Sequence, residues 1–155
     1  MSLYRSIFGL VFVPLFFSLA QAQTVDPANP QSVVSALQDL GYRAELSADS
    51  EGDPQISSAI EGSMFRITFY GCDANVNCSA MNFASGFDLS TPLSWEVVNE
   101  WNRTKLVGRV YVDEENDPFI DFFIDAQGGL PRDVFESVMS RWGVAVASFK
   151  KEIDF

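Results

Sequence analysis

The alternation of apolar and polar residues over positions 106–125 predicts two antiparallel β-strands joined by a short turn. Successive side chains of a strand point to opposite faces of a sheet, so the apolar positions define one buried face. A polar Glu-Glu-Asn-Asp-Pro break at residues 114–118 supplies the turn. The residues expected on the buried face are Val110, Val112, Ile120, Phe122 and Ile124.

A short amphipathic helix is predicted immediately before this hairpin. Trp95, Val98 and Trp101 are spaced three residues apart, and this spacing places side chains on one helical face. Pro92 suits the first turn, and Ser94 or Thr91 can cap the free backbone N–H groups. The two tryptophans are six positions apart, so they cannot both point straight at a core beneath the helix.

The first half of the chain predicts one helix followed by four strands. Asn29 and Pro30 favour a helix start, and Gly41 favours its end. Apolar and polar residues then alternate over four segments, residues 42–48, 55–61, 64–70 and 81–87. A last helix begins at Pro131 and carries one apolar stripe. The stripe consists of Phe135, Val138, Met139, Trp142, Val146 and Phe149.

The order of these elements, α-β-β-β-β-α-β-β-α, predicts an α+β fold. Strands that follow one another are linked by short turns, so we expect a single antiparallel sheet. Each helix has one apolar stripe, and most strands have one apolar face. Helices packed on one face of the sheet are therefore the simplest arrangement, and the other face stays uncovered.

Residues 1–22 have the features of a cleaved secretory signal peptide. Arg5 precedes an apolar run over residues 7–17, and the segment ends in an Ala-Gln-Ala motif at residues 20–22. An uncleaved membrane anchor is the alternative, but the apolar run is shorter than the roughly 20 residues that a spanning helix requires. The sequence therefore predicts export and a periplasmic or secreted location, with no membrane insertion after cleavage.

The remaining chain is long enough for one domain with its own hydrophobic core. We expect a flexible leader at residues 23–29, because this segment is polar and contains a proline. Residues 30–155 then form the single predicted domain.

The charge of the chain limits its partners. Removal of the signal segment, whose one charged residue is Arg5, leaves nine basic and 21 acidic residues and a formal net charge of −12. Such a surface repels phosphate backbones and anionic lipids, so we expect no binding to nucleic acid or to a membrane surface. Basic partners are favoured.

Cys72 and Cys78 are the two cysteines of the chain, and export predicts that they form a disulfide. They lie between two predicted strands, where a bridge would fix the register of a hairpin. A zinc site is one alternative, but the chain has no histidine and no further thiol to complete the coordination. A redox-active pair is another, and five intervening residues rather than two argue against it.

The composition and motifs of the chain also exclude several kinds of catalytic site. A chain without histidine has no histidine-based triad and no imidazole general base. It has neither a Gly-rich phosphate loop after a strand nor a G-x-S-x-G nucleophile motif. We therefore predict a protein that is not an enzyme and that carries no cofactor and no metal.

The acidic turn at residues 113–117 is the densest group of carboxylates and could offer oxygen ligands to Ca²⁺. It lacks the glycine and the distal glutamate of an EF-hand loop. A solvated hairpin tip is the favoured interpretation, and cation binding is the alternative.

Three short motifs in the second half of the chain are Glu-Trp-Asn-Arg at residues 100–103, Gly-Arg-Val-Tyr-Val-Asp at residues 108–113 and Gly-Gly at residues 128–129. They resemble the YbjN family, described as bacterial sensory-transduction regulators, and residues 71–78 resemble its exported branch with two cysteines. The resemblance covers about residues 30–149. It implies a fold like that of type III secretion chaperones, which bind segments of other proteins, and it supplies no catalytic residue.

The face that the helices leave uncovered is the predicted recognition surface. Three aromatic side chains lie there among hydrogen-bonding groups, a composition typical of interaction surfaces. Arg109 is expected near Asp121 or Phe123, as part of a weak surface charge pair. Ordinary cross-strand pairing is the alternative interpretation of the face. The residues placed on it are Arg66, Thr68, Tyr70, Asn82, Arg109, Tyr111, Asp121 and Phe123.

The residues predicted to contact a partner are Tyr70, Arg109, Tyr111, Phe123, Trp95 and Trp101. For the two tryptophans, one interpretation buries one of them and packs the other at the edge of the core. The other interpretation is a homodimer formed through their helix.

Together these features predict an exported, non-enzymatic module of the bacterial envelope that is chaperone-like and binds a protein or peptide partner or regulates a process. A small-ligand sensor or a carboxylate-dependent hydrolase is the alternative, and a structural envelope protein acting as a dimer is a third hypothesis.

Overall fold

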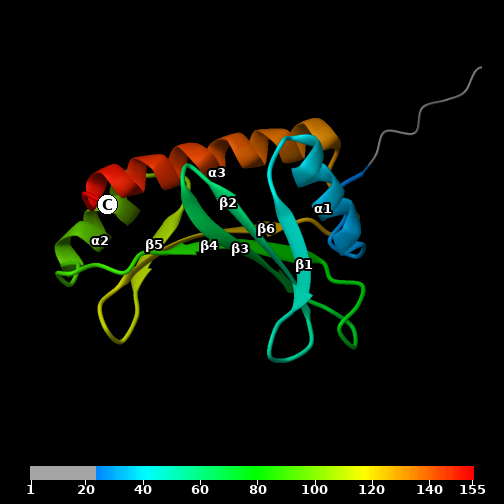
Figure 1. Cartoon of the computed structure of the whole chain (residues 1–155), viewed down its shortest axis with the longest axis horizontal. Coiled ribbons are helices and arrows are strands. Elements are labelled where there is room, and N and C mark those ends of the chain that lie inside the picture. The colour runs from blue at the N-terminus through cyan, green and yellow to red at the C-terminus, as the bar shows by residue number, and fades with distance from the viewer. Residues whose placement is uncertain (1–23) are drawn as a thin grey trace, which may run out of the picture.

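The computed structural model describes residues 24–155, which form three helices and six strands (Figure 1). The predicted signal peptide, residues 1–22, lies outside the described residues. In chain order the elements are α1 (Pro30–Asp39), β1 (Ala44–Ala48), β2 (Pro54–Ile60), β3 (Ser63–Tyr70), β4 (Ala80–Gly86), α2 (Trp95–Thr104), β5 (Arg109–Val112), β6 (Pro118–Asp125) and α3 (Arg132–Glu152).

The six strands form one antiparallel sheet in the order β1-β2-β3-β4-β6-β5. The helix α2 connects β4 to the edge strand β5, and β6 then returns to pair with both β5 and β4. This confirms the predicted α+β fold and the predicted order of its elements. Within residues 24–155, no helix combines the length and the apolarity that crossing a bilayer requires.

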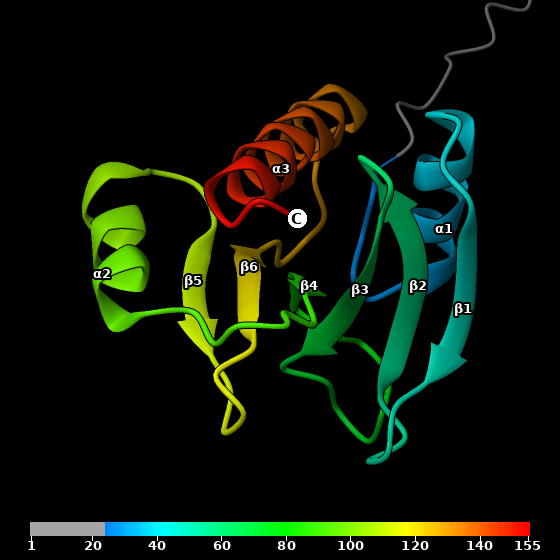
Figure 2. The same ribbon diagram turned by 60° about the vertical axis from the view of Figure 1, so that its left-hand side comes forward.

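The long helix α3 lies across one face of the sheet, with α1 near its N-terminal end and α2 near its C-terminal end (Figures 1 and 2). Trp142 of α3 is fully buried and packs against the rings of Phe65 in β3 and Phe83 in β4, at centroid distances of 6.0 and 6.1 Å. All six residues of the predicted apolar stripe on α3 are buried. The hydrophobic core therefore lies between α3 and the sheet.

The hairpin formed by β5 and β6 has the predicted buried face, with burial that weakens toward its ends. Val110 and Ile120 are buried, whereas Val112, Phe122 and Ile124 are half-buried and pack against the core. The difference arises because β5 is short and lies at the edge of the sheet.

The segment before α1 is ordered by the fold, which corrects the expectation of a flexible leader for residues 24–29. Val25 is buried and exchanges backbone hydrogen bonds of 2.9 and 2.8 Å with Leu130, two residues before the last helix. The backbone N–H of Asp26 also donates to the hydroxyl of Ser32, at 2.8 Å. A long-range backbone bridge of this kind leaves no trace in a local polar composition.

Asn29 and Ser94 occupy the N-cap positions of α1 and α2, but neither side chain makes a capping hydrogen bond. The predicted capping role of Ser94 is therefore wrong. Both helices instead bury apolar side chains against the core, including Leu37 of α1 and Trp101 of α2.

The predicted disulfide between Cys72 and Cys78 is present in the loop between β3 and β4. Asn75, inside the bridged loop, donates its side-chain N–H to the carboxylate of Asp53 at 2.8 Å and to the carbonyl of Glu51 at 3.1 Å. The bridged loop is thus also tied, through Asn75, to the neighbouring loop between β1 and β2. A disulfide is compatible with an oxidising compartment.

Candidate functional site

The face of the sheet opposite α3, here called the helix-free face, is the candidate functional site. The β1–β2 and β5–β6 hairpins project their tips away from α3 and flank this face (Figure 1). Two hollows lie on it. The larger, of about 650 Å³, is bounded by both hairpins, and the smaller, of about 390 Å³, lies over β3, β4, β5 and β6.

The smaller hollow is built around an ion pair between two neighbouring strands. Arg109 and Asp121 are directly opposite in the register of β5 and β6. The guanidinium of Arg109 donates two hydrogen bonds to the carboxylate of Asp121, from Nε to Oδ1 at 3.0 Å and from Nη2 to Oδ2. Two parallel charge-assisted bonds fix both side chains in one geometry.

The two partners of this pair differ sharply in exposure, which corrects the expectation of a surface charge pair. Asp121 is only 4% exposed, whereas the side chain of Arg109 is 70% exposed. A buried carboxylate is costly unless it is paired, so Asp121 depends on Arg109 for compensation. The exposed guanidinium in turn keeps one edge free to face solvent or a ligand.

Asn82 of β4 completes the polar floor of the smaller hollow. Its side-chain N–H lies 3.5 Å from Oδ2 of Asp121, at the long limit of a hydrogen bond. Its side-chain oxygen is buried and has no hydrogen-bond partner among residues 24–155. The floor therefore has one acceptor to which residues 24–155 donate no hydrogen bond.

Aromatic rings surround the ion pair on the same face. The guanidinium of Arg109 lies 5.2 Å from the centroid of the Tyr111 ring, within the range of a cation–π contact. On the other side of the hollow, the rings of Tyr70 and Phe123 are 6.2 Å apart. Phe123 is 58% exposed, so a large apolar ring faces solvent beside a fixed charge.

Phe119 is a member of this face that the sequence pattern did not identify. Its ring stacks on Tyr111 at 5.4 Å with an interplanar angle of 12° and lies over Gly86, where a Cβ atom would be 2.5 Å from the ring. Phe119 and Asp121 lie two positions apart in β6 and therefore point to the same face, so the alternation could have identified Phe119. The break at residues 114–118 placed it directly after a turn, whereas β6 begins at Pro118.

The pKa shifts of Arg109 and Tyr111 favour the protonated form of both side chains. The hydrogen bonds from Arg109 to Asp121, and the negative charge of Asp121, raise the pKa of the Arg109 guanidinium. Burial, and then the negative charge of Asp121, raise the pKa of the Tyr111 hydroxyl. Arg109 is therefore a cation and Tyr111 a neutral hydrogen-bonding phenol across the physiological range.

The larger hollow has an apolar and basic floor with an acidic rim. Met64 and Arg66 of β3 are exposed on the floor, and Tyr111 separates this hollow from the smaller one. The rim beside β5 and β6 carries Asp113 and Asp117. The two hollows together form one surface that runs across the strands.

The acidic turn that we considered as a cation site is held together by its own carboxylate. Oδ1 of Asp113 accepts the backbone N–H groups of Glu115 and Asp117, both at 2.9 Å. Within the part of the chain that the structure describes, no group of three or more potential metal ligands is arranged to hold an ion. The carboxylate of Asp113 thus binds the backbone of the turn itself.

The structure separates the six residues predicted to contact a partner. Tyr70, Arg109 and Phe123 surround the smaller hollow, and Tyr111 lies at its boundary. Trp95 and Trp101 lie on α2, away from this face: Trp95 is 64% exposed and Trp101 only 2%. Trp101 cannot contact a partner without opening the core.

The motifs at residues 100–103 and 108–113 hold α2 against the edge of β5. The indole N–H of Trp101 donates to the carbonyl of Gly108 at 2.7 Å, and the side chain of Asn102 pairs with the backbone of Val110. Gly108 has a φ of 83°, and a Cβ there would lie 2.6 Å from Cδ1 of Ile120. These positions thus need these residues for structural reasons.

Comparison with known proteins gives one result that bears on function. No curated protein and no solved structure matches the chain, so the likeness to type III secretion chaperones stays a prediction. The sequence model of the YbjN family, whose description is "Putative bacterial sensory transduction regulator", matches residues 29–155. This match covers nearly all of the described residues, and the chain therefore belongs to the YbjN family.

Proposed function

We propose that this protein is an exported, non-enzymatic regulatory module of the bacterial envelope that binds an extended segment of another protein across its helix-free face. A regulatory role fits the description of the family. The chaperone-like mode of action, in which a segment of a partner is held on a sheet, is our addition to that role.

The observation that carries the proposal is the uncovered aromatic and charged surface on the sheet. Phe123, Tyr70 and Met64 are exposed large side chains on one face, next to the rigid pair of Arg109 and Asp121. Aromatic and arginine side chains of this kind dominate the energetics of protein interfaces. A partner that covers these side chains gains apolar burial. It does not have to order the charged groups first, because the pair of Arg109 and Asp121 is already fixed.

The chemistry of the surface favours a basic segment with apolar side chains. The chain carries a formal net charge of −11, and Asp88, Asp113 and Asp117 line the larger hollow. Lysine or arginine residues of a partner would meet this acidic rim, while apolar residues would lie on Met64 and Phe123. Attraction of this type raises the rate of association and is weakened by salt.

Two features support export. The sequence of residues 1–22 has the pattern of a signal peptide, and the disulfide between Cys72 and Cys78 is compatible with an oxidising compartment.

An enzymatic role has less support from the geometry. Asp121 is the one carboxylate that lines the smaller hollow, and Arg109 already holds it. At the larger hollow, Asp113 and Asp117 each accept backbone N–H groups. Hydrolysis by paired carboxylates needs two acids with different protonation states near one bond. A small-ligand sensor is compatible with the size of the hollow, about 390 Å³, and the experiment below separates it from the proposal.

The test is a screen of immobilised peptides that vary in charge and aromatic content, probed with the purified protein. We expect binding to basic peptides with apolar residues, lost in Phe123→Ala and Tyr111→Ala. The matched control is Val134→Ala, an exposed apolar position on α3. Equal binding by all variants would reject the assigned surface. Thermal stabilisation by small metabolites, without peptide binding, would favour the sensor.

A further inference from the structure

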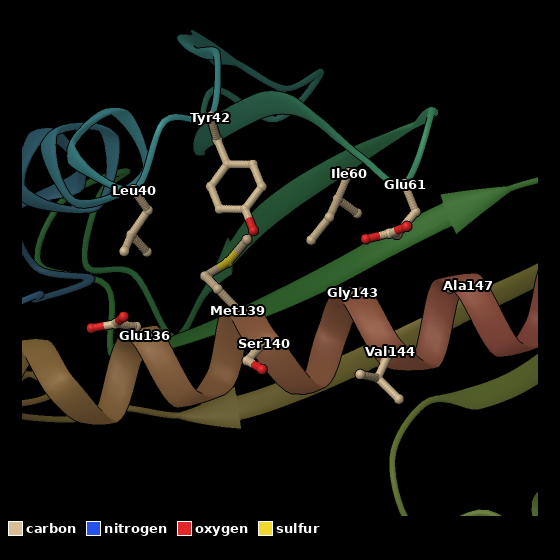
Figure 3. Close-up of a pocket in the computed structure, with 10 residues that line it drawn as sticks. All are labelled: Leu40, Tyr42, Ile60, Glu61, Glu136, Met139, Ser140, Gly143, Val144 and Ala147. Atoms are coloured by element: carbon tan, nitrogen blue, oxygen red, sulfur yellow. The ribbon is translucent and has the colours of Figure 1, made fainter.

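The outer side of α3 carries a ridge with a groove on each side. Ser140 and Val144 line both grooves, so they form the ridge between them. The first groove, of about 480 Å³, lies between α3 and the ends of α1 and β2 (Figure 3). The second, of about 360 Å³, lies between α3 and the segment from Thr104 to Val107 after α2.

The ridge and the second groove expose apolar side chains that the fold leaves uncovered. Leu106 is fully exposed and Val144 is 66% exposed. Close approach to the ridge is unobstructed, because Ser140, Val144 and Ala147 are small or short side chains. Gly143 lies below them, where a Cβ would be only 3.0 Å from Cδ1 of Ile60. A second helix could therefore lie directly on this side of α3.

The two grooves carry charges of opposite sign. Glu61 and Glu136 line the first groove, with the Tyr42 ring pointing down toward α3 between the two carboxylates (Figure 3). Lys105 and Arg141 line the second groove. Within residues 24–155, none of these four charged groups takes part in an ion pair.

We propose that a second copy of this chain docks on this side of α3, with the two ridges lying against each other. A two-fold axis parallel to α3 brings the acidic groove of one copy against the basic groove of the other, twice in the dimer. A two-fold axis perpendicular to α3 would instead set acidic against acidic and basic against basic. The charges thus select an approximately parallel arrangement of the two α3 helices.

A second copy fits this surface better than an acidic or a basic peptide does. An acidic partner would be attracted by Lys105 and Arg141 but repelled by Glu61 and Glu136, and a basic partner would show the reverse. Both grooves are satisfied only by a partner that places a basic group against the acidic groove and an acidic group against the basic groove. A second copy related by the two-fold axis does this. The helix itself is nearly neutral, with four basic and three acidic residues, so the repulsion expected from the acidic net charge of the chain is reduced here.

The dimer surface is independent of the proposed peptide site. The helix-free face lies on the opposite side of the sheet from α3, so both copies in the dimer keep it open (Figure 2). Loss of dimerisation therefore leaves peptide binding intact, and loss of peptide binding leaves the dimer intact.

The experiment is sedimentation velocity on two charge-reversal variants. Lys105→Glu with Arg141→Glu makes both grooves acidic, and Glu61→Lys with Glu136→Lys makes both basic. We expect the wild-type protein to dimerise at micromolar concentration and each variant alone to associate on the order of tenfold or more weakly. An equimolar mixture of the two variants should dimerise again, because every groove then faces one of opposite sign.

The recovery in the mixture keeps the test independent of folding defects, since misfolded variants would not pair. The control is Glu114→Lys with Glu115→Lys, an equal charge change at the exposed tip of the β5–β6 hairpin, and it should dimerise like the wild type. A wild-type monomer at high micromolar concentration, or a mixture that stays monomeric, overturns the proposal.

Discussion

The side-chain amide of Asn102 pairs with both backbone groups of Val110. Its Nδ2 donates to the Val110 carbonyl and its Oδ1 accepts the Val110 N–H, each at 2.9 Å. Val110 lies in β5, an edge strand of the sheet, so the amide satisfies the groups that a further strand would otherwise bind. An unprotected edge of this kind is a site for unwanted strand pairing. Asn102 therefore closes the edge as well as anchoring α2.

Replacing Asn102 with alanine should lower the free energy of unfolding by about 1–3 kcal/mol, because two hydrogen bonds are lost and the edge of β5 is opened. Urea denaturation measures the loss, and light scattering should show more aggregation near the midpoint. Asn99→Ala is the matched control, since Asn99 is exposed on the same helix. Equal stability of the two variants would contradict the role given to Asn102.

The pairing of Asn102 also shows where sequence reasoning succeeds and where it ends. The alternation of apolar and polar residues identified the buried Val110 and Ile120, because every second side chain of a strand points to the same face. It could not show that the amide of Asn102 reaches Val110, since that contact depends on how the helix turns back to the strand. For the two tryptophans, spacing excluded a shared burial but did not say that Trp101 is the buried one.

Only part of the candidate site could be predicted from the sequence, and the burial of its residues could not. Strand parity placed Tyr70, Arg109, Tyr111 and Phe123 on one uncovered face, and the structure places them there. The burial of Asp121 in β6 depends on neighbouring residues of β4 and β5, so no single segment of sequence encodes it. The grooves beside α3 likewise form between elements that are distant in the chain.

Replacing Arg109 with alanine should destabilise the fold by about 1–3 kcal/mol, although the guanidinium itself is mostly exposed. The loss arises because the buried carboxylate of Asp121 is left with only its long contact to Asn82. Arg109→Lys should recover only part of the loss, since an ammonium cannot make the two parallel bonds.

A double-mutant cycle with Asp121→Asn checks this interpretation. In the Asp121→Asn background, Arg109→Ala should lower the free energy of unfolding much less than it does in the wild type. Additive effects of the two substitutions would mean that the pair is the weak surface contact first expected.

Reduction of the bridge between Cys72 and Cys78, or its replacement by two serines, should lower the free energy of unfolding by about 2 kcal/mol. The closed loop is short, so the entropy that the bridge removes from the unfolded chain is modest. The change should extend beyond the loop, because Asn75 anchors the neighbouring turn at residues 49–53. Hydrogen exchange should therefore increase at residues 49–53 in the reduced protein. An increase confined to residues 71–79 would show that the two loops are not coupled.

Stability should fall at alkaline pH through Tyr111. Burial and the charge of Asp121 raise its pKa in the folded protein, with Arg109 acting in the opposite direction. The folded state therefore holds the phenolic proton more tightly than the unfolded state, whose tyrosine pKa is about 10. The contribution of this group is complete below that value and is lost as the pH rises through the higher pKa of the folded state. Urea denaturation of the wild type and of Tyr111→Phe between neutral and alkaline pH measures the effect. The difference between the two proteins should be constant below the unfolded-state pKa and should shift against the wild type above it, whereas parallel curves throughout would mean that Tyr111 ionises as freely in the fold as in the unfolded chain.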